Sequence, residues 1–461
     1  MATAVTLAGL DELRAQVRGE VIAPDDVRYE EARKIYNAMI DKHPALIVGC
    51  RDVADVQAAL AFGKANGLDI AVRGAGHNGA GLGTVDDGLV IDLSPMRWVR
   101  VDPSARTAQV GGGCMMSDID HATHAFGLAV PVGIIGTTGV GLLLGGGVGH
   151  LTRKHGLAID NIVAADVVLA DGTFARASED ENADLFWAIR GGGGNFGVVT
   201  ALTLNLHPVS TVIAGPILWP LDQAAEVLAW YREFLPAQPD ELTGFFAFLT
   251  VPPGPPFPEE LHMQKMCGVA WCIGGDAAHA EALLEPARKV GKPALDGVME
   301  LPLPAWNTAF DALYPAGDQW YWRGDYFKEI PDAAIEKHVE FGKKLPTWKS
   351  TMHLYPSDGT ASRVAADATP WAYRDAKWTG VFAGVDPDPA NADVIREWTI
   401  DYFEALHPYS MGGSYVNFMM EEGQDRVQAT YGSNYERLAR VKAQYDPDNV
   451  FHVNQNIKPA S

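Results

Sequence analysis

A single histidine, His77, lies in a stretch so rich in glycine that few other side chains have room, VRGAGHNGAGLG at residues 72–83. Glycine lacks Cβ and readily adopts positive φ, so neighbouring glycines can turn their backbone N–H groups toward one point, which suits an anion. A neutral imidazole beside that point is a nucleophile held next to whatever the anion belongs to. The stretch therefore predicts an anion-binding turn with a reactive histidine. A turn histidine satisfied by backbone carbonyls is the alternative.

Two further glycine clusters follow, at residues 145–149 and 191–197. One cluster alone would indicate only a tight turn. Neither the strand, G-x-G-x-x-G and helix fingerprint of dinucleotide-binding folds nor a P-loop ending in Gly-Lys-Ser/Thr is present, which disfavours both classes of enzyme. Three loops that converge on one long, phosphate-bearing cofactor explain the set better.

The elements that must position these turns are short. Residues 52–66 predict an amphipathic helix with Asp52 as N-cap and an end at Gly67. Further segments predict strands at 68–74, 88–94, 98–102 and 107–113, a helix at 116–127, a hairpin over 160–178, and a helix, glycine turn and strand over 184–209. Because helices and strands mix without strict alternation, the fold class is α+β.

From about residue 209 the composition changes, since glycine clusters vanish while proline-rich loops and aromatic runs lie between helical segments at 221–236 and 331–346. The last fifty residues hold a strand-like SYVNFMM at 414–420 and a helix near 434–447. This piece is too small to fold alone and must dock on another domain. We expect domains at 1–208 and 209–410, and a docked segment at 411–461.

Composition excludes several classes of partner. The 461 residues include 36 Lys and Arg against 58 Asp and Glu, a formal net charge of -22, which repels nucleic acid and acidic membrane surfaces. The first residues lack a basic and apolar leader and no apolar run is long enough to span a membrane, so we expect a cytoplasmic protein. The four cysteines, Cys50, Cys114, Cys267 and Cys272, show neither disulfide nor metal-site spacing, so we expect core residues and no metal.

Four stretches carry a resemblance to a known family. They are HPALIVGCRDVADVQAALAFGKANGLDIAVRGAGHN, GLLLGGGVGHLTRKHGLAIDNIVAADVVLADG, DLFWAIRGGGGNFGVV and YDPDNVFHVNQNIKP. Together they resemble the berberine-bridge-enzyme-like branch of the FAD-linked oxidases, which have the vanillyl-alcohol-oxidase or PCMH-type FAD fold. The resemblance implies a two-lobed FAD-binding domain, a substrate domain with a large antiparallel sheet, and a C-terminal segment that returns to the FAD domain.

The resemblance also assigns roles to residues. In this family the first glycine turn binds the FAD pyrophosphate and its histidine is bonded to the flavin 8α-methyl carbon, which implies a covalent bond at His77. Many relatives add a cysteinyl bond, but Ile134 and Ile135 stand there and Cys114 comes about twenty residues too early, so no second link is expected. The other FAD-binding positions that the resemblance implies are Arg73, Gly74, Ala75, Gly76, Asn78, Gly81, Gly145, Gly146, Gly147, Gly149, Asp160, Asn161, Gly194, Asn195, Val198, Asn454 and Asn456.

A flavin oxidant takes a hydride at N5 while a base removes the neighbouring proton. The family's Y-x-N-Y/F motif is present at residues 415–418, where Tyr415 carries the only phenol hydroxyl and is the expected base if a cationic neighbour lowers its pKa. A simple structural role in a strand is the alternative. His353 and Tyr321 are further catalytic candidates. Alternation along residues 320–322 puts Trp320 and Trp322 on one face of a strand and Tyr321 on the other, so only one set can face the flavin.

The sequence thus predicts an FAD-dependent oxidase that takes a hydride from a CH–OH or CH–NH carbon of a small or medium-sized metabolite, such as a sugar, glycoside, polyketide or alkaloid. Dioxygen would accept the electrons and become hydrogen peroxide. A dehydrogenase with another electron acceptor and a flavin-binding protein without turnover are the alternatives. A homodimer is possible.

Overall fold

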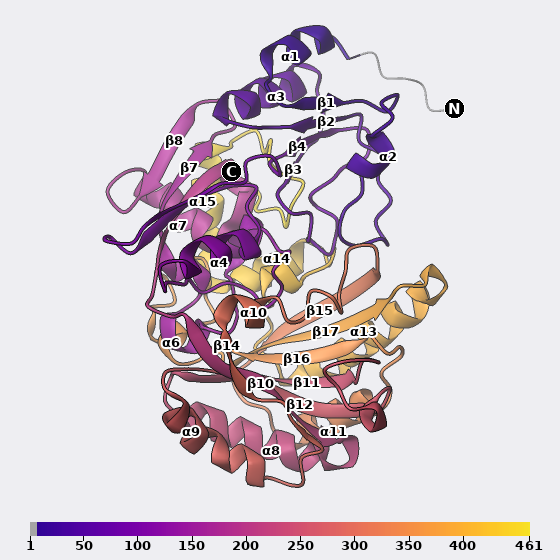
Figure 1. The fold of residues 1–461 in the computed structure, drawn as a ribbon. Coiled ribbons are helices and arrows are strands. Elements are labelled where there is room, and N and C mark those ends of the chain that lie inside the picture. The colour runs from indigo at the N-terminus through magenta and orange to yellow at the C-terminus, as the bar shows by residue number, and fades with distance from the viewer. Residues whose placement is uncertain (1–6) are drawn as a thin grey trace.

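The computed structural model describes residues 7–461, so the start of the N-terminal stretch examined for a leader, residues 1–6, lies outside it. Figure 1 shows an N-terminal half with two sheets above a half built on one large sheet. The C-terminal segment lies against the N-terminal half. None of the helices in the described part of the chain has the length and apolar character needed to cross a membrane.

The first sheet holds the strand that leads into the His77 turn. Its order is β1 (Glu20–Ile22), β2 (Leu46–Gly49), β4 (Leu89–Asp92) and β3 (Ile70–Arg73), with β2 and β3 parallel to β4. Helix α3 (Val53–Ala65) connects β2 to β3 and begins where the sequence predicts, because the Asp52 side chain accepts a hydrogen bond from Asp55 N. Two shorter helices, α1 (Leu10–Gln16) and α2 (Tyr29–Ala32), precede it.

The second sheet is antiparallel and lies beside the other two glycine clusters. Its order is β5 (Val99–Asp102), β6 (Thr107–Gly111), β9 (Val198–Asn205), β7 (Ile162–Val168) and β8 (Phe174–Ser178). The expected hairpin is the β7 and β8 pair, and the expected helix, turn and strand are α7 (Ala183–Gly192) followed by β9. The remaining helices of this half are α4 (Met116–His124), α5 (Val140–Gly145) and α6 (Thr152–His155).

The third sheet has eight strands, as the expected α+β fold with a large antiparallel sheet requires. Its main path is β13 (Leu295–Asp296), β10 (Thr211–Pro220), β12 (Lys265–Gly274), β11 (Leu242–Thr250), β16 (Thr351–Pro356), β17 (Trp378–Asp386) and β15 (Gln319–Phe327), and β14 (Met299–Pro302) pairs with β10. Its helices are α8 (Ala224–Phe234), α9 (Ala277–Lys289), α10 (Leu303–Asn307), α11 (Asp332–Lys343), α12 (Thr360–Arg363) and α13 (Ala392–Leu406).

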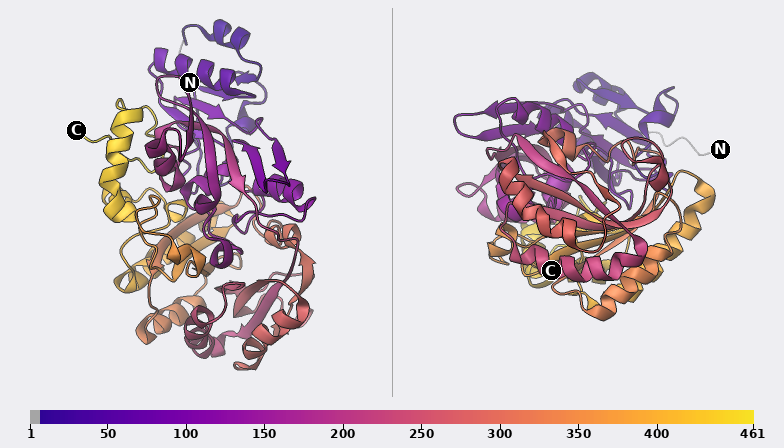
Figure 2. Two further views of the ribbon diagram at one scale, coloured as in Figure 1. Left: turned by 90° about the vertical axis from the view of Figure 1, so that its left-hand side faces the viewer. Right: turned by 60° about the horizontal axis from the view of Figure 1, so that its bottom comes forward.

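Alternation along the strands gives this sheet two different faces. Phe246 and Phe248 of β11 pack in the apolar core that α8, α11 and α13 cover. Phe245 and Ala247 belong to the core shared with the N-terminal half. Figure 2 shows the helices on the outer side of the sheet. The inner face is therefore free to line a site at the junction of the two halves.

The expected strand at 414–420 is wrong. Residues Val416–Phe418 form a short 3₁₀ turn, because the side chains of Tyr415 and Asn417 bind the backbone around α5 in place of a strand ladder. Helices α14 (Gln424–Tyr431) and α15 (Tyr435–Tyr445) follow, the second where the sequence predicts it. The buried Lys442 ammonium of α15 donates to the carbonyl of Asn195 at 2.6 Å, which docks the C-terminal segment on the third glycine cluster.

Candidate active site

One cavity lies between the glycine turns and the inner face of the third sheet. All three glycine clusters contribute to its lining, through Gly74, Gly76 and Gly83, through Gly145, and through Gly192, Gly193 and Gly194. The C-terminal stretch 451–455 also lines it. The expected convergence of the three clusters is therefore what the structure shows.

Arg73 ends β3 at the start of the first turn. Its guanidinium forms a 2.7 Å ion pair with Asp92, which lies opposite it on β4. Nη1 of Arg73 is buried and has no hydrogen-bond partner within the described residues. Since an unpaired buried donor is costly, this cation is ready for an anionic group in the cavity. Gly76 adopts a φ of 74°, where a side chain would be strained.

His77 lines the same cavity as an uncharged ring. The ring of Tyr36 stacks on it with centroids 3.7 Å apart, and Thr137 Oγ1 lies 2.9 Å from its Nε2. Burial lowers the pKa of His77 to about 3. The imidazole is therefore neutral at physiological pH and keeps a lone pair, as a nucleophile must.

Most neighbouring residues of the first turn also line the cavity, whereas residues 79–81 do not. Ala75 and Asn78 lie in the lining and Gly81 lies outside it. A Cβ on Gly81 would approach Ile40 to 2.5 Å, so packing already requires glycine there. Ile134 and Ile135 face the cavity, whereas Cys114 is buried elsewhere with its Sγ 3.1 Å from the carbonyl of Trp98. The lining described here contains no cysteine thiol that could form a cysteinyl bond.

Of the glycines in the second cluster, Gly145 lines the cavity, and Val148 of the same cluster lines it as well. A Cβ on Gly145 would lie 2.3 Å from Asn417 Oδ1. A Cβ on Gly149 would lie 1.8 Å from the carbonyl oxygen of Val132. Three further glycines of this cluster, which close packing also requires, lie outside the lining, and their contact with a cofactor stays a prediction: Gly146, Gly147 and Gly149.

Asp160 and Asn161 likewise lie outside the cavity lining. The Asp160 carboxylate forms a buried ion pair with Arg374 at 2.7 Å and accepts from the backbone N–H of Leu157. The Asn161 amide donates to the carbonyls of His155 and Leu157. Both residues hold the loop after α6, and their expected contact with a cofactor stays a prediction.

The third cluster and the C-terminal stretch meet at Asn195, which lines the cavity together with Gly194. The Asn195 amide donates to the carbonyl of Gly192 at 2.8 Å, and its oxygen accepts from the backbone N–H of Ile457 at 2.9 Å. Asn454 lines the cavity, and its Oδ1 is buried without a partner within residues 7–461. Val198 is fully buried in the first sheet's core and Asn456 lies outside the lining, so the expected cofactor contacts of these two residues stay predictions.

The third sheet contributes an aromatic wall. Trp320 and Trp322 of β15 face the cavity. Tyr321 between them points to the other side, where Arg396 of α13 lies 5.6 Å above its ring. The alternation that the sequence predicts thus brings the two tryptophans into the lining, and Tyr321, a catalytic candidate, lies outside it.

His353 and Tyr355 of β16 form a pair in this wall. Nδ1 of His353 lies 2.6 Å from the hydroxyl oxygen of Tyr355, and both residues line the cavity. Burial lowers the pKa of His353 to about 3, so the ring is neutral. Burial also raises the pKa of Tyr355 well above its usual value. The pair therefore offers a neutral imidazole to a buried substrate.

Tyr415 lines the cavity in a setting that differs from the expected one. Its hydroxyl oxygen accepts from the backbone N–H of Gly147 at 2.9 Å and from the Asn417 amide at 2.6 Å, and neither partner is charged. Burial raises the pKa of Tyr415 to about 12. The expected lowering of this pKa by a cation is wrong, and the phenol stays protonated at neutral pH.

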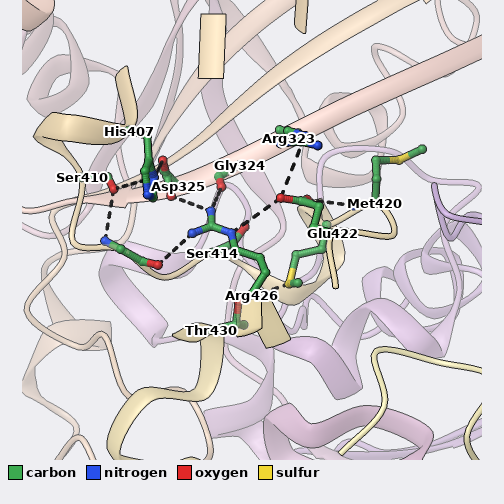
Figure 3. Close-up of polar contacts among 12 residues, drawn as sticks. Arg323, Gly324, Asp325, His407, Ser410, Ser414, Met420, Glu422, Arg426 and Thr430 are labelled. Atoms are coloured by element: carbon green, nitrogen blue, oxygen red, sulfur yellow. Dashed lines mark hydrogen bonds and ion pairs between the residues drawn. The ribbon is translucent and has the colours of Figure 1, made fainter. Parts of the chain in front are cut away.

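A buried charge network holds the segment that carries Tyr415 against β15 (Figure 3). Arg426 of α14 forms a 2.6 Å ion pair with the fully buried Asp325 and donates to the carbonyls of Gly324 and Gly412. Asp325 also accepts from His407 at 2.8 Å. The network therefore ties the chain at Gly412, shortly before Tyr415, to β15 and α14.

Three residues near the site, Tyr36, Thr137 and Asn417, were not predicted from the sequence as functional residues. Tyr36 comes from a loop without a motif, and Thr137 is one of two adjacent threonines in a turn. Asn417 falls within the Y-x-N-F motif, which was the one signal that could have marked it.

Comparison with known proteins indicates which cofactor the chain binds. A family model described as FAD binding domain matches residues 44–178, and one described as berberine and berberine like matches residues 414–458. An FAD-linked oxidoreductase of Dictyostelium discoideum is 31% identical over 456 residues, covering 98% of this chain and 97% of that protein. The chain belongs to the berberine-bridge-enzyme-like family of FAD-linked oxidoreductases.

Other berberine-bridge-enzyme-like proteins resemble the chain over a similar length. The (R)-6-hydroxynicotine oxidase of Paenarthrobacter nicotinovorans is 29% identical, with 96% of this chain and 97% of that one covered. The crystal structure of 6-hydroxy-D-nicotine oxidase from Arthrobacter nicotinovorans superposes with a TM-score of 0.85 at 29% identity, covering 96% of this chain and 98% of that one.

The lining of this berberine-bridge-enzyme-like oxidoreductase fits FAD. The free Nη1 of Arg73 and the glycine turns suit a pyrophosphate, and the Asn454 side-chain oxygen, which has no partner within the described residues, offers an acceptor for a donor group. Arg73 is the one charged side chain in the lining among residues 7–461, so the rest of the cavity suits uncharged rings.

Proposed function

We propose that the protein is an oxidase that carries FAD covalently on His77 and oxidises a CH–OH or CH–NH carbon of a small or medium-sized metabolite. When bound, FAD supplies the acceptor for a hydride and passes the electrons on to dioxygen. The observation that supports this most is that one cavity joins the neutral His77 and its glycine turn to the aromatic wall of the third sheet.

His353 is the proposed general base. A base must be unprotonated before it acts, and burial keeps His353 neutral whereas the pKa of Tyr415, about 12, keeps that phenol protonated. With Nδ1–H donating to Tyr355, Nε2 of His353 carries the lone pair that takes the substrate proton. The charge that develops on the imidazole is then stabilised by the oxygen of Tyr355, 2.6 Å away.

The wall also restricts the substrate. Trp320, Trp322, Tyr314 and Phe418 offer flat apolar surface, and the only polar groups near them are neutral. A charged substrate would lose its hydration there without gaining a partner, which is costly. We therefore propose an uncharged substrate with a planar ring, and an amine would react in its neutral form.

The visible spectrum tests this function. Purified protein is mixed with neutral aromatic alcohols and amines without oxygen, and air is then admitted. The oxidase predicts bleaching of the flavin band, rapid recovery in air and one hydrogen peroxide per substrate. Bleaching that air does not reverse would identify a dehydrogenase, and no bleaching with any substrate would favour a flavin-binding protein without turnover. Homodimer formation and a cytoplasmic location stay predictions.

A further inference from the structure

We propose that a chain of packed aromatic rings carries single electrons between the cofactor cavity and the protein surface. Its rings, in order, are Tyr415, Trp371, Tyr326 and Tyr373. The chain fills an electron vacancy that an oxidant creates beside the cofactor, and it moves that vacancy to a place where a soluble reductant repairs it. The inference requires FAD in the cavity, and it holds for an oxidase and a dehydrogenase alike.

The chain begins with Tyr415, which lines the cavity. The ring of Trp371 packs on it with centroids 5.1 Å apart. Trp371 lies in the loop between α12 and β17, outside the lining, so this contact leads away from the cavity. A Cβ on Gly146 would lie 2.4 Å from the ring of Trp371 and 2.8 Å from that of Tyr415. The glycine therefore provides the space in which the two rings meet.

Two further contacts continue the chain beyond Trp371. The ring of Tyr326 on β15 lies 5.0 Å from Trp371 and 4.9 Å from Tyr373, measured between centroids, and the second pair is stacked. These separations are usual for aromatic rings in contact. Trp371 and Tyr326 are buried, whereas Tyr373 is partly exposed. The chain therefore joins the cavity lining to the surface in steps of nearly equal length.

The residue types of the chain suit electron transfer. Indole and phenol rings give up a single electron far more readily than a phenyl ring does, and all members of the chain are of these two kinds. The aromatic rings beside His77 differ in where they lead. Tyr36, Trp320 and Tyr314 pack on one another, and all three are buried. That group ends inside the protein, whereas the proposed chain reaches solvent.

Release of a proton decides where the vacancy comes to rest, because an oxidised phenol is stable only once its proton has left. The oxygen of Tyr415 accepts from the backbone N–H of Gly147 and from the Asn417 amide, and neither group takes up a proton. Trp371 can lose an electron and keep its N–H proton. At the partly exposed Tyr373, water can take the proton. The vacancy should therefore settle there as a neutral tyrosyl radical.

The electrons and protons of this transfer balance. An oxidant in the cavity, such as the bound flavin under blue light, gains one electron. Tyr373 loses one electron and its phenol proton, and the proton goes to water. Each ring between them gains one electron and loses one. A soluble thiol then restores Tyr373 by giving up one hydrogen atom, and two thiyl radicals combine to a disulfide.

Illumination of the holoprotein tests the chain. Protein freed of unbound flavin is exposed to blue light without oxygen, together with a nitroso spin trap and a cobalt(III) complex that takes the electron from the flavin and prevents its return. Mass spectrometry of the digested protein then locates the trapped radical. We expect the adduct on Tyr373. Adducts that lie only on other residues, or no adduct at all, would overturn the inference.

Two variants interrupt the chain at different rings. Trp371→Phe and Tyr326→Phe each replace an oxidisable ring with a phenyl ring, and electron transfer weakens steeply with distance. Most of the Tyr373 adduct should therefore be lost in both variants, when the yield is expressed per bound flavin. An undiminished Tyr373 adduct in either variant would show that the radical arrives by another route.

Trp306→Phe is the matched control. It makes the same change in a buried tryptophan that packs against His150 and Phe310, outside the chain. The yield of the Tyr373 adduct per bound flavin should equal that of the wild type. A loss as large as that in Trp371→Phe would mean that disturbed packing, and not a broken chain, lowers the yield, and it would overturn the inference.

Discussion

Gly79 of the first glycine turn packs directly against the indole of Trp322 on β15. A Cβ on Gly79 would lie 2.3 Å from Cζ2 of that ring. The same junction is tied by Asn37, whose amide donates to the carbonyls of Gly79 and Trp320. The turn beside His77 and the aromatic wall are thus joined by a contact that leaves no room for a methyl group.

Gly79→Ala should therefore displace Trp322 and lower the free energy of unfolding by about 1–3 kcal/mol, the usual cost of overpacking. Denaturant titration measures this loss. The double-mutant cycle with Trp322→Phe is the control, because a smaller ring provides space and the alanine should then cost clearly less. The same cost in both backgrounds would mean that the indole is not what excludes the methyl group.

His77→Ala should abolish covalent flavin without preventing folding. Wild-type protein precipitated with acid should stay yellow, and the His77→Ala precipitate should be colourless, while circular dichroism of the two proteins agrees. The reason is that the lining of Arg73, the glycine turns and Asn454 does not depend on the imidazole. A yellow precipitate from His77→Ala would assign the bond to another residue.

His353→Gln should lower the anaerobic rate of flavin reduction by about a hundredfold, the usual contribution of a positioned base. Since the pKa of His353 is about 3, the base is unprotonated throughout the neutral range. The wild-type rate should then be constant from about pH 5 to pH 9 and fall only as the pH approaches that pKa. Rapid-mixing spectroscopy across this range measures the profile, and an unchanged rate in His353→Gln excludes the residue.

Tyr415→Phe should act mainly on stability. It leaves the N–H of Gly147 and the amide of Asn417 without their shared acceptor, which should cost about 1–3 kcal/mol of unfolding free energy. If Tyr415 were the base, its pKa of about 12 would make the wild-type rate rise about tenfold per pH unit through the alkaline range. If the wild-type rate shows that slope and Tyr415→Phe loses it, Tyr415 and not His353 is the general base.

His407 should make stability depend on pH. The hydrogen bond with Asp325 raises the pKa of His407 above its usual 6.5 in the folded state. The stabilisation is therefore complete below the unfolded-state pKa and is lost as the pH rises through the higher folded-state pKa. Denaturation at pH 6 and pH 9 should show a larger difference between wild type and His407→Asn at pH 6. An equal difference at both values contradicts the pairing.

Local signals predicted the elements better than the contacts of the site. Helix α3 was readable because Asp52 caps it and Gly67 follows its end. The stretch 414–420 was misread because its apolar residues resemble a strand, while the Asn417 amide binds the carbonyl of Leu142 far away in the chain. Similarly, nothing near Asp160 reveals that its partner is Arg374. The glycine-rich stretch marked His77 and the resemblance implied its bond to flavin, whereas the low pKa that keeps its ring neutral comes from burial.

The buried contact between Lys442 and Asn195 sets the order in which the holoprotein can be made. Part of the cavity wall is residues 451–455, and the ammonium that holds this end in place also donates to the carbonyl of Phe451. A ribosome releases the earlier glycine turns long before these residues emerge. The nascent chain therefore presents an incomplete pocket until residues 451–455 have emerged.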